Sequence, residues 1–224
     1  MIGFAHGTLS PWGYIYDAET LPDFITPLDF SNFTNGKFGV ADARISPNIA
    51  SASAAIRNYC GWHISPSLEC GMFYNVHDLR DAFVGPDLLI QLPATYVSKV
   101  SEVILNAKDR DGELEGEIIS DPDRFDAGMG NGLLRIYDVG RLDRKSKIFV
   151  KYTAGLPASN IAVIKEQVAN RVSHAVTNSY GITSEAAGGV SVTYNSAWAG
   201  KSSSTALAND SREVLDTYKV KGVF

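Results

Sequence analysis

The 224-residue sequence predicts an α+β fold: a small helical bundle with an inserted antiparallel β domain, sandwich- or barrel-like in form. Three observations predict it. Apolar residues recur at helical spacing near both ends of the chain, and short alternating segments separated by turn residues fill the middle. The chain also begins with an extended arm and ends with a polar tail. The expected parts are an irregular N-terminal arm over 1–21, a helical region over 22–61, a β-rich insertion over 62–155, a long helix and strand that complete the core over 156–199, and a C-terminal tail with a short helix over 200–224.

The composition is that of an ordinary globular protein, with 45% hydrophobic and 20% charged residues and a formal net charge of −5. No segment approaches the roughly 20 apolar residues of a membrane span, and the first 23 residues lack the pattern of a secretory signal. Two cysteines are too few for a disulfide framework. We therefore expect folding in the cytoplasm with both thiols free, and a Cys60–Cys70 disulfide is the alternative.

The first helical region contains two start signals. In TPLDFSNFT, Thr26 is the expected N-cap, Pro27 the first helical residue and Asp29 a favourable charge in the first turn. In SPNIASASAAIRNYCG, Ser46 is the expected cap and Pro47 the first residue of a longer helix. One face of that helix carries Ile49, Ala52, Ile56, Tyr59 and Cys60. The opposite face is rich in alanine and serine, which allows close approach of another helix.

The middle of the chain changes to short strands. Five apolar or alternating segments are separated by turn sequences: DLLIQL, YVSKVSEVIL, ELEGEII, GLLRIY and SKIFVKYTA. The apolar pattern between Val97 and Leu105 slips by one residue, which indicates a β-bulge. Asp111-Gly112 and Asn131-Gly132 are hairpin signals.

The last third begins with the clearest helix of the sequence. It carries one apolar stripe of Ile161, Ile164, Val168, Val172 and Ala175, and Gly181 is the expected end. GGVSVTYN then alternates as a strand. AGKSSST leads to NDSREVLDTYK, a short helix capped by Asn209 or Asp210.

Candidate metal sites are incomplete. Cys60, His63, Cys70 and His77 form a C-x2-H-x6-C-x6-H series, but zinc sites usually contain two closely spaced pairs, and only the first pair is close here. DRDGELEGEIIS begins like a calcium loop, yet Leu114 stands where glycine is needed and Ser120 where glutamate is needed. We expect a buried thiol, surface histidines and a hairpin instead.

Catalytic patterns are also weak. GMGNG lacks the Lys-Ser/Thr of a phosphate loop, no G-x-S-x-G motif is present, and His174 lies within a predicted helix. The acidic series Glu113, Glu115 and Glu117 allows a hydrolase hypothesis, but alternate carboxylates on a strand usually face solvent. RLDRKSKIFVK fits a lysine-guarded hairpin edge better than a phosphate-binding surface. We expect no catalytic residue, no metal and no cofactor.

Several segments together resemble the head-to-tail connector (adaptor) proteins of tailed bacteriophages. They are the helix ending in AAIRNYCGWHISP, the β region closing with IFVKYTAGLP, the long helix, GGVSVTYN and the terminal REVLDTYK. The resemblance covers roughly residues 22–220 and leaves the aromatic arm outside.

This resemblance implies a structural virion protein in the neck between capsid and tail, made in the host cytoplasm. Copies would form a dodecameric ring that docks on the portal protein, extends the channel for genomic DNA and joins the stopper or tail. DNA would pass without sequence-specific binding, repelled by acidic residues that face the channel. No membrane partner is expected.

The resemblance also suggests roles for two sets of residues. In such proteins the C-terminal segment commonly reaches into the portal. The candidate docking residues are therefore Val214, Leu215, Tyr218, Val220 and Phe224. The alternative is that the terminal helix folds back on its own bundle. Cys60, Gly61, Trp62 and His63 form the expected structural junction between helix and β insertion. Gly61 would end the helix, Trp62 would bury on the order of 200 Å², and His63 would bond a helix-end carbonyl.

A second hypothesis is a β-domain binding module for a carbohydrate or a host surface. The adjacent aromatic residues Phe73 and Tyr74 motivate it.

Overall fold

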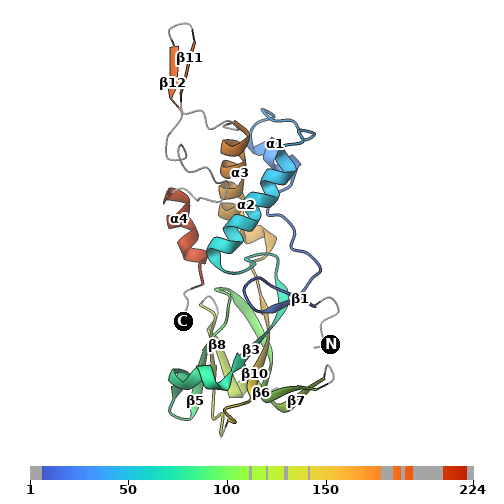
Figure 1. The fold of residues 1–224 in the computed structure, drawn as a ribbon, viewed down its shortest axis with the longest axis vertical. Coiled ribbons are helices and arrows are strands. Elements are labelled where there is room, and N and C mark those ends of the chain that lie inside the picture. The colour runs from blue at the N-terminus through green and yellow to red at the C-terminus, as the bar shows by residue number, and fades with distance from the viewer. Residues whose placement is uncertain are drawn as a thin grey trace. The chain divides into compact units, whose positions relative to one another are not determined.

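The computed structural model confirms the α+β prediction (Figure 1). It describes residues 7–110, 113–119, 121–128, 131–140, 142–177, 184–187, 190–193 and 209–220. The chain divides into two compact units. The β unit consists of Met1–Leu21, Gly61–Asn160 and Lys219–Phe224, and the helical unit consists of Pro22–Cys60 and Ile161–Tyr218. Each unit is described by itself below.

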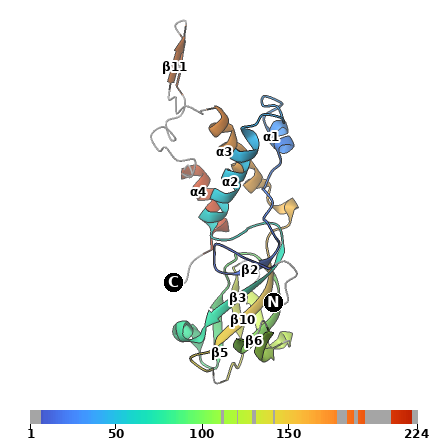
Figure 2. The ribbon, with the colours of Figure 1, turned by 45° about the vertical axis from the view of Figure 1, so that its right-hand side comes forward.

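The helical unit is assembled from both ends of the sequence. Its helices are α1 (Pro27–Phe33), α2 (Ile45–Cys60), α3 (Ala162–Thr177) and α4 (Asn209–Leu215), and α4 continues into the 3₁₀ turn η5 (Asp216–Tyr218). The strands β11 (Ser184–Ala187) and β12 (Val190–Thr193) pair as a hairpin. Helix α2 contacts α1, α3 and α4, and both ribbon views show it among them (Figures 1 and 2). Among the described residues no helix has the length and apolar character for crossing a membrane.

Helix α1 begins as predicted, with a reciprocal capping box. The hydroxyl of Thr26 accepts from the backbone N–H of Asp29 at 3.1 Å, and the Asp29 carboxylate accepts from the backbone N–H of Thr26 at 2.8 Å. These bonds satisfy two donors that the first turn of a helix leaves unpaired. They also lower the pKa of Asp29, because they favour the charged carboxylate.

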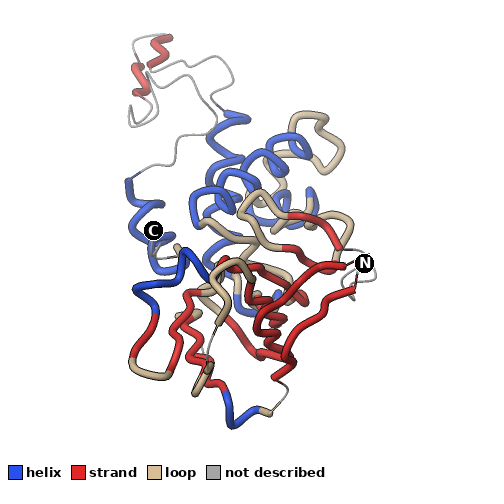
Figure 3. The backbone as a smooth tube through the Cα atoms, turned by 60° about the horizontal axis from the view of Figure 1, so that its bottom comes forward, coloured by secondary structure: helices blue, strands red, loops and turns tan. Residues whose placement is uncertain are grey.

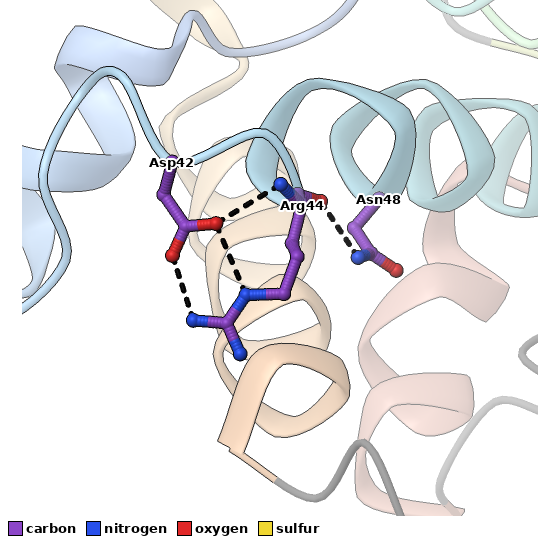
Figure 4. Close-up of polar contacts among 3 residues, drawn as sticks. All are labelled: Asp42, Arg44 and Asn48. Carbon is purple, nitrogen blue, oxygen red and sulfur yellow. Dashed lines mark hydrogen bonds and ion pairs between the residues drawn. The ribbon is translucent and has the colours of Figure 1, made fainter.

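Helix α2 begins one residue earlier than the predicted cap, Ser46. The carboxylate of Asp42 accepts from the backbone N–H of Arg44 at 3.0 Å and from its guanidinium at 3.0 and 2.7 Å (Figure 4). Asn48 donates its side-chain N–H to the Arg44 carbonyl at 2.8 Å. The turn at 42–44 therefore starts the helix at Ile45, and Pro47 is tolerated because first-turn N–H groups need no helical acceptor. The Arg44 side chain and backbone hold the pKa of Asp42 down to about 2.

Helices α2 and α3 pack together along the stripes expected from the sequence. Fully or nearly fully buried side chains on the two helices are Ile49, Ala52, Ile56, Cys60, Ile164, Val168, Val172 and Val176. Burial of a large aliphatic side chain contributes about 2 kcal/mol, so this packing dominates the stability of the helical unit. Helix α3 ends at Thr177, and the predicted stop Gly181 lies outside the described residues.

The β unit contains two antiparallel sheets and, among its described residues, no closed barrel. The six-stranded sheet has the order β1-β2-β3-β10-β6-β7, and the four-stranded sheet has the order β4-β5-β9-β8. Figure 3 shows the strands of the chain in red. The strands are β1 (Gly7–Leu9), β2 (Ile15–Asp17), β3 (Leu68–Asn75), β4 (Phe83–Val84), β5 (Asp87–Gln91), β6 (Val97–Arg110), β7 (Glu113–Ile119), β8 (Phe125–Gly128), β9 (Leu133–Ile136) and β10 (Lys147–Ala154). Short 3₁₀ turns η1 (Val76–Ala82), η2 (Pro122–Arg124) and η3 (Ala158–Asn160) connect them.

The core of the β unit is formed by alternate residues of both sheets. Side chains exposed by at most 1% include Leu88, Ile90, Leu134, Ile136, Ile148, Val150 and Tyr152. Tyr74 of β3 donates to the backbone carbonyl of Gln91 in β5 at 2.9 Å and so bonds the two sheets directly. The burial of β5 and β9 alternates with the period of two expected for strands with one buried face, whereas β10 is buried on both faces at Ile148, Phe149 and Val150.

The prediction of an irregular arm over 1–21 is wrong for its described part. Strands β1 and β2 pair with each other, and β2 pairs with β3 at Ile15 and Tyr16. The hydroxyl of Ser10 accepts from the backbone N–H groups of Trp12 and Tyr14, both at 3.2 Å, and thereby closes the turn between them. Strands of three residues are too short to give a recognisable alternation, so the sequence pattern missed them.

The predicted bulge of the β region and its turn at Asn131-Gly132 are confirmed. The register of β6 against β10 shifts at three places, and Asn106 of β6 has a φ of +52°. Strands β6 and β7 pair antiparallel, and the predicted turn residues Asp111-Gly112 lie outside the described residues. Strands β8 and β9 form a hairpin at Asn131-Gly132, where Gly132 adopts a φ of +68°.

Candidate functional site

The predicted junction residues stand where the chain leaves the helical unit. Cys60 is the last residue of α2, and Gly61 follows in the left-handed conformation with a φ of +78°, as predicted. Trp62 and His63 belong to the β unit, and both side chains are completely buried. His63 does not bond a helix-end carbonyl. Its Nε2 lies 3.0 Å from the carbonyl oxygen of Ala154, the last residue of β10, which corrects that prediction.

Hydrogen bonding fixes the tautomer of His63. A carbonyl oxygen only accepts, so Nε2–H donates to Ala154 and Nδ1 is left as an acceptor. The Tyr14 hydroxyl lies 2.8 Å from Nδ1 and donates to it, while the same hydroxyl accepts from the backbone N–H of His63 at 3.0 Å. Both ring nitrogens are thereby used in structural bonds. Ring contacts surround the pair Tyr14 and His63. Trp12 stacks on Tyr14, Trp62 contacts His63 edge-on, and Tyr16 contacts both Tyr14 and His63.

The junction segment, residues 61–67, also contains backbone strain. Ile64 is completely buried and has a φ of +65°, a region that β-branched residues rarely adopt. Ser65 N–H bonds the His63 carbonyl at 2.8 Å across it, which makes a tight γ-turn. Leu156 N–H bonds the Ile64 carbonyl at 2.7 Å. Gly155 has a φ of +120°, and a Cβ there would overlap the Pro66 carbonyl oxygen. The strained turn at Ile64 is thus held in place by close backbone contacts with Gly155 and Leu156.

The four residues of the zinc hypothesis do not gather into a site. Cys70 lies in β3, where burial raises the pKa of its thiol to about 12. His77 is exposed and pairs with Asp78 at 3.2 Å. Cys60 and Cys70 are both buried and are not bonded to each other. Within the described ranges, no three Cys, His, Asp or Glu side chains are placed to hold a metal ion.

The acidic residues of β7 and the pair Phe73 and Tyr74 motivated a hydrolase and a binding-module hypothesis, and the structure gives them other surroundings. Glu115 and Glu117 are exposed on β7, and Glu117 lies 3.8 Å from Arg124; the side chain of Glu113 is outside the description. Phe73 packs on Phe149 with ring centroids 4.8 Å apart. Its neighbour Tyr74 points to the other face of β3, where its hydroxyl bonds Gln91. The pair therefore forms no common aromatic platform.

Helix α4 contacts the end of α2 within the helical unit. Leu215 is completely buried, and its carbonyl lies 3.8 Å from the Cys60 thiol. The Tyr59 hydroxyl donates to the Asp216 carboxylate at 2.6 Å. We call these four residues the C-terminal contact. It corresponds to the fold-back alternative, in which the terminal helix packs on its own bundle. Of the other candidate docking residues, Val214, Tyr218 and Val220 are half-buried, and Phe224 lies outside the described residues.

The helical unit exposes an uncharged face of α2 and several large apolar side chains on other elements. The solvent-facing side of α2 consists of Ser46, Pro47, Ala50, Ser51, Ala54 and Asn58, and the only charged residue of this helix, Arg57, is buried. Large apolar side chains lie exposed on α1, on the segment that follows it and on the first turn of α3: Leu28 at 57%, Phe33 at 46%, Val40 at 48% and Val163 at 40%. The cores of protein interfaces are depleted of charge, so these surfaces are suited to contact with another chain.

Comparison with known proteins identifies no relative: the sequence matches no protein-family model and no curated protein.

Proposed function

We propose that this protein is a structural component of a tailed-bacteriophage virion, a head-to-tail connector. Copies form a dodecameric ring that docks on the portal protein, extends the DNA channel and receives the stopper or tail protein. The protein lies in the neck of the virion and performs no catalysis. Genomic DNA passes through the ring without sequence-specific contacts.

The observation that carries this proposal is the way the chain is assembled. Helices from both ends of the sequence, α2 and α3, pack into one unit, and the sheet-rich segment 61–160 is inserted between them. A connector of the kind that the sequence resembles requires this arrangement. Had residues 46–60 and 160–180 lain apart, the resemblance would have lost its structural basis.

The exposed surfaces of the helical unit support assembly with other copies. The uncharged face of α2 and the apolar side chains Leu28, Phe33 and Val40 belong to different elements of one chain. A contact between unlike surfaces of identical subunits is heterologous, and heterologous contacts close into rings when the rotation between neighbours divides a full turn.

The composition of the described core supports a non-catalytic role. His63 uses both ring nitrogens in buried structural bonds, and the side chains of Glu115 and Glu117 on β7 are exposed to solvent.

Native mass spectrometry and negative-stain imaging test the proposal. The purified protein is measured alone and with the portal protein of a phage from the same host. Rings, or ring-on-portal complexes, are the expected result. A protein that stays monomeric in both samples contradicts the proposal; binding to a glycan array by such a monomer would favour the carbohydrate-binding module instead. No observation on Phe73 or Tyr74 now favours that second hypothesis.

A further inference from the structure

The C-terminal contact joins two segments that are far apart in the chain. Thirty-one residues separate Thr177, the end of α3, from Asn209, the start of α4. When the hairpin from Ser184 to Thr193 is folded, positions 178–183 and 194–208 still provide 21 residues of connection. Extended chain covers about 3.3 Å per residue, so this connection reaches about 70 Å, more than twice the roughly 30 Å diameter of a small domain.

Among the described side chains of residues 212–220, only Leu215 is fully buried, and the hydrogen bond between Tyr59 and Asp216 lies at the surface. The groups that receive α4 are the last residues of α2, which every copy of the chain presents identically. An α4 from a second copy would make the same contacts as the copy's own α4.

We propose that neighbouring copies exchange α4, so that Leu215 and Asp216 of one chain pack on Tyr59 and Cys60 of the next. Exchange of an identical element creates a link between subunits without requiring a new contact surface. A flexible connection of this length would give α4 an effective concentration on the order of 1 mM at its own site. In a ring, the α2 end of the neighbouring copy is available to α4 at a comparable effective concentration, whereas in a dilute solution of monomers it is not. This inference rests on the proposed ring as the setting in which exchange matters.

Disulfide trapping tests the exchange, because the Cys60 thiol lies beside Leu215. One chain carries C70A and keeps Cys60. The other carries C60A, C70A and L215C. A disulfide between Cys60 and position 215 can then form only between two chains. The two full-length proteins are mixed under reducing conditions, equilibrated overnight at about 1 mM or about 10 μM each, oxidised and separated without reductant. Each protein alone is the control for unrelated dimers.

We expect about half of the chains in covalent heterodimers at 1 mM and at least a tenfold smaller fraction at 10 μM. A single chain with Cys60, C70A and L215C should close internally in dilute solution, which verifies that the two positions can bond. If that chain closes but the mixture gives no heterodimer above the controls at 1 mM, exchange is excluded. Circular dichroism checks the folding of L215C, and V214C on the same helix replaces it if needed. If native mass spectra show rings but only internal disulfides form, the exchange of α4 is wrong and the proposed function stands. If disulfide-linked heterodimers form but no rings are seen, the exchange stands and the proposed function is wrong.

Discussion

The junction segment and the C-terminal contact involve neighbouring residues of the sequence, but they are held in opposite ways. Residues 62–65 are all buried, and they form hydrogen bonds with Tyr14, Ala154 and Leu156. The C-terminal contact instead contains one fully buried side chain, Leu215, and a hydrogen bond that lies at the surface. The first region is enclosed within the β unit. The second lies partly at the surface, as the proposed exchange of α4 requires.

This difference teaches where strain can be kept in a subunit. The γ-turn at Ile64 costs on the order of 1–3 kcal/mol and persists only because its surroundings determine it completely.

The largest effect is expected at Gly155. Replacement by alanine places a Cβ against the Pro66 carbonyl oxygen and 2.8 Å from the Cα of Ser67, at a φ of +120°. We expect a loss of about 3 kcal/mol in the free energy of unfolding, measured by urea denaturation. Gly85→Ala is the matched control, because Gly85 also has a positive φ of +66° but nothing within 4 Å of its Cβ position. Its cost should be about 1 kcal/mol. Equal costs would show that the junction tolerates backbone movement.

An intermediate effect is expected for Tyr14→Phe. This change leaves Nδ1 and the backbone N–H of His63 without the Tyr14 hydroxyl in a buried site, which costs about 1–3 kcal/mol. Tyr152→Phe is the control. The Tyr152 hydroxyl is equally buried but has no hydrogen-bond partner among the described residues, so its removal should be neutral or slightly stabilising. Thermal unfolding of the two variants should therefore shift in different directions or by clearly different amounts. A Tyr152→Phe variant that loses as much stability as Tyr14→Phe would contradict this account.

The smallest effect is expected for Tyr59→Phe in the C-terminal contact, at most about 1 kcal/mol, because the hydrogen bond is exposed to solvent. The contribution of the Tyr59–Asp216 hydrogen bond to stability should depend on pH. The bond to Asp216 raises the pKa of Tyr59 above its usual value of 10. The contribution is thus complete below pH 10 and disappears as the pH rises through the higher folded-state pKa. The rate of Cys60 modification by a thiol reagent, corrected for intrinsic thiol reactivity, should increase over that range in the wild type. Tyr59→Phe should remove the increase and raise the rate at neutral pH.

The elements with long-range periodicity or specific caps could be predicted from the sequence. The stripe on α3, the Thr26 capping box, the left-handed Gly61 and the hairpin at Asn131-Gly132 each follow from local chemistry that one segment contains in full. The start of α2 was missed by one residue because the Asp42–Arg44 pair starts the helix before the Ser46-Pro47 signal.

The candidate site could be predicted only in part. Gly61 and the burial of Trp62 were expected, but the bonding of His63 was not, because its partners Tyr14 and Ala154 lie 49 and 91 residues away. The strands of the arm are similarly defined by pairing with β3 rather than by their own sequence. Whether the terminal helix folds back could not be derived either, since Leu215 is compatible with burial on any apolar surface.

The division of the helical unit between two segments has a consequence for synthesis. One hundred residues, Gly61–Asn160, separate the end of its first segment from the start of the second. At about 5–20 residues per second, a ribosome needs about 5–20 s to deliver α3 after α2. During this interval the apolar stripe of α2 has no α3 to cover it, whereas the β unit already contains nearly all of its strands. The nascent chain should therefore complete its sheets first and its helices last.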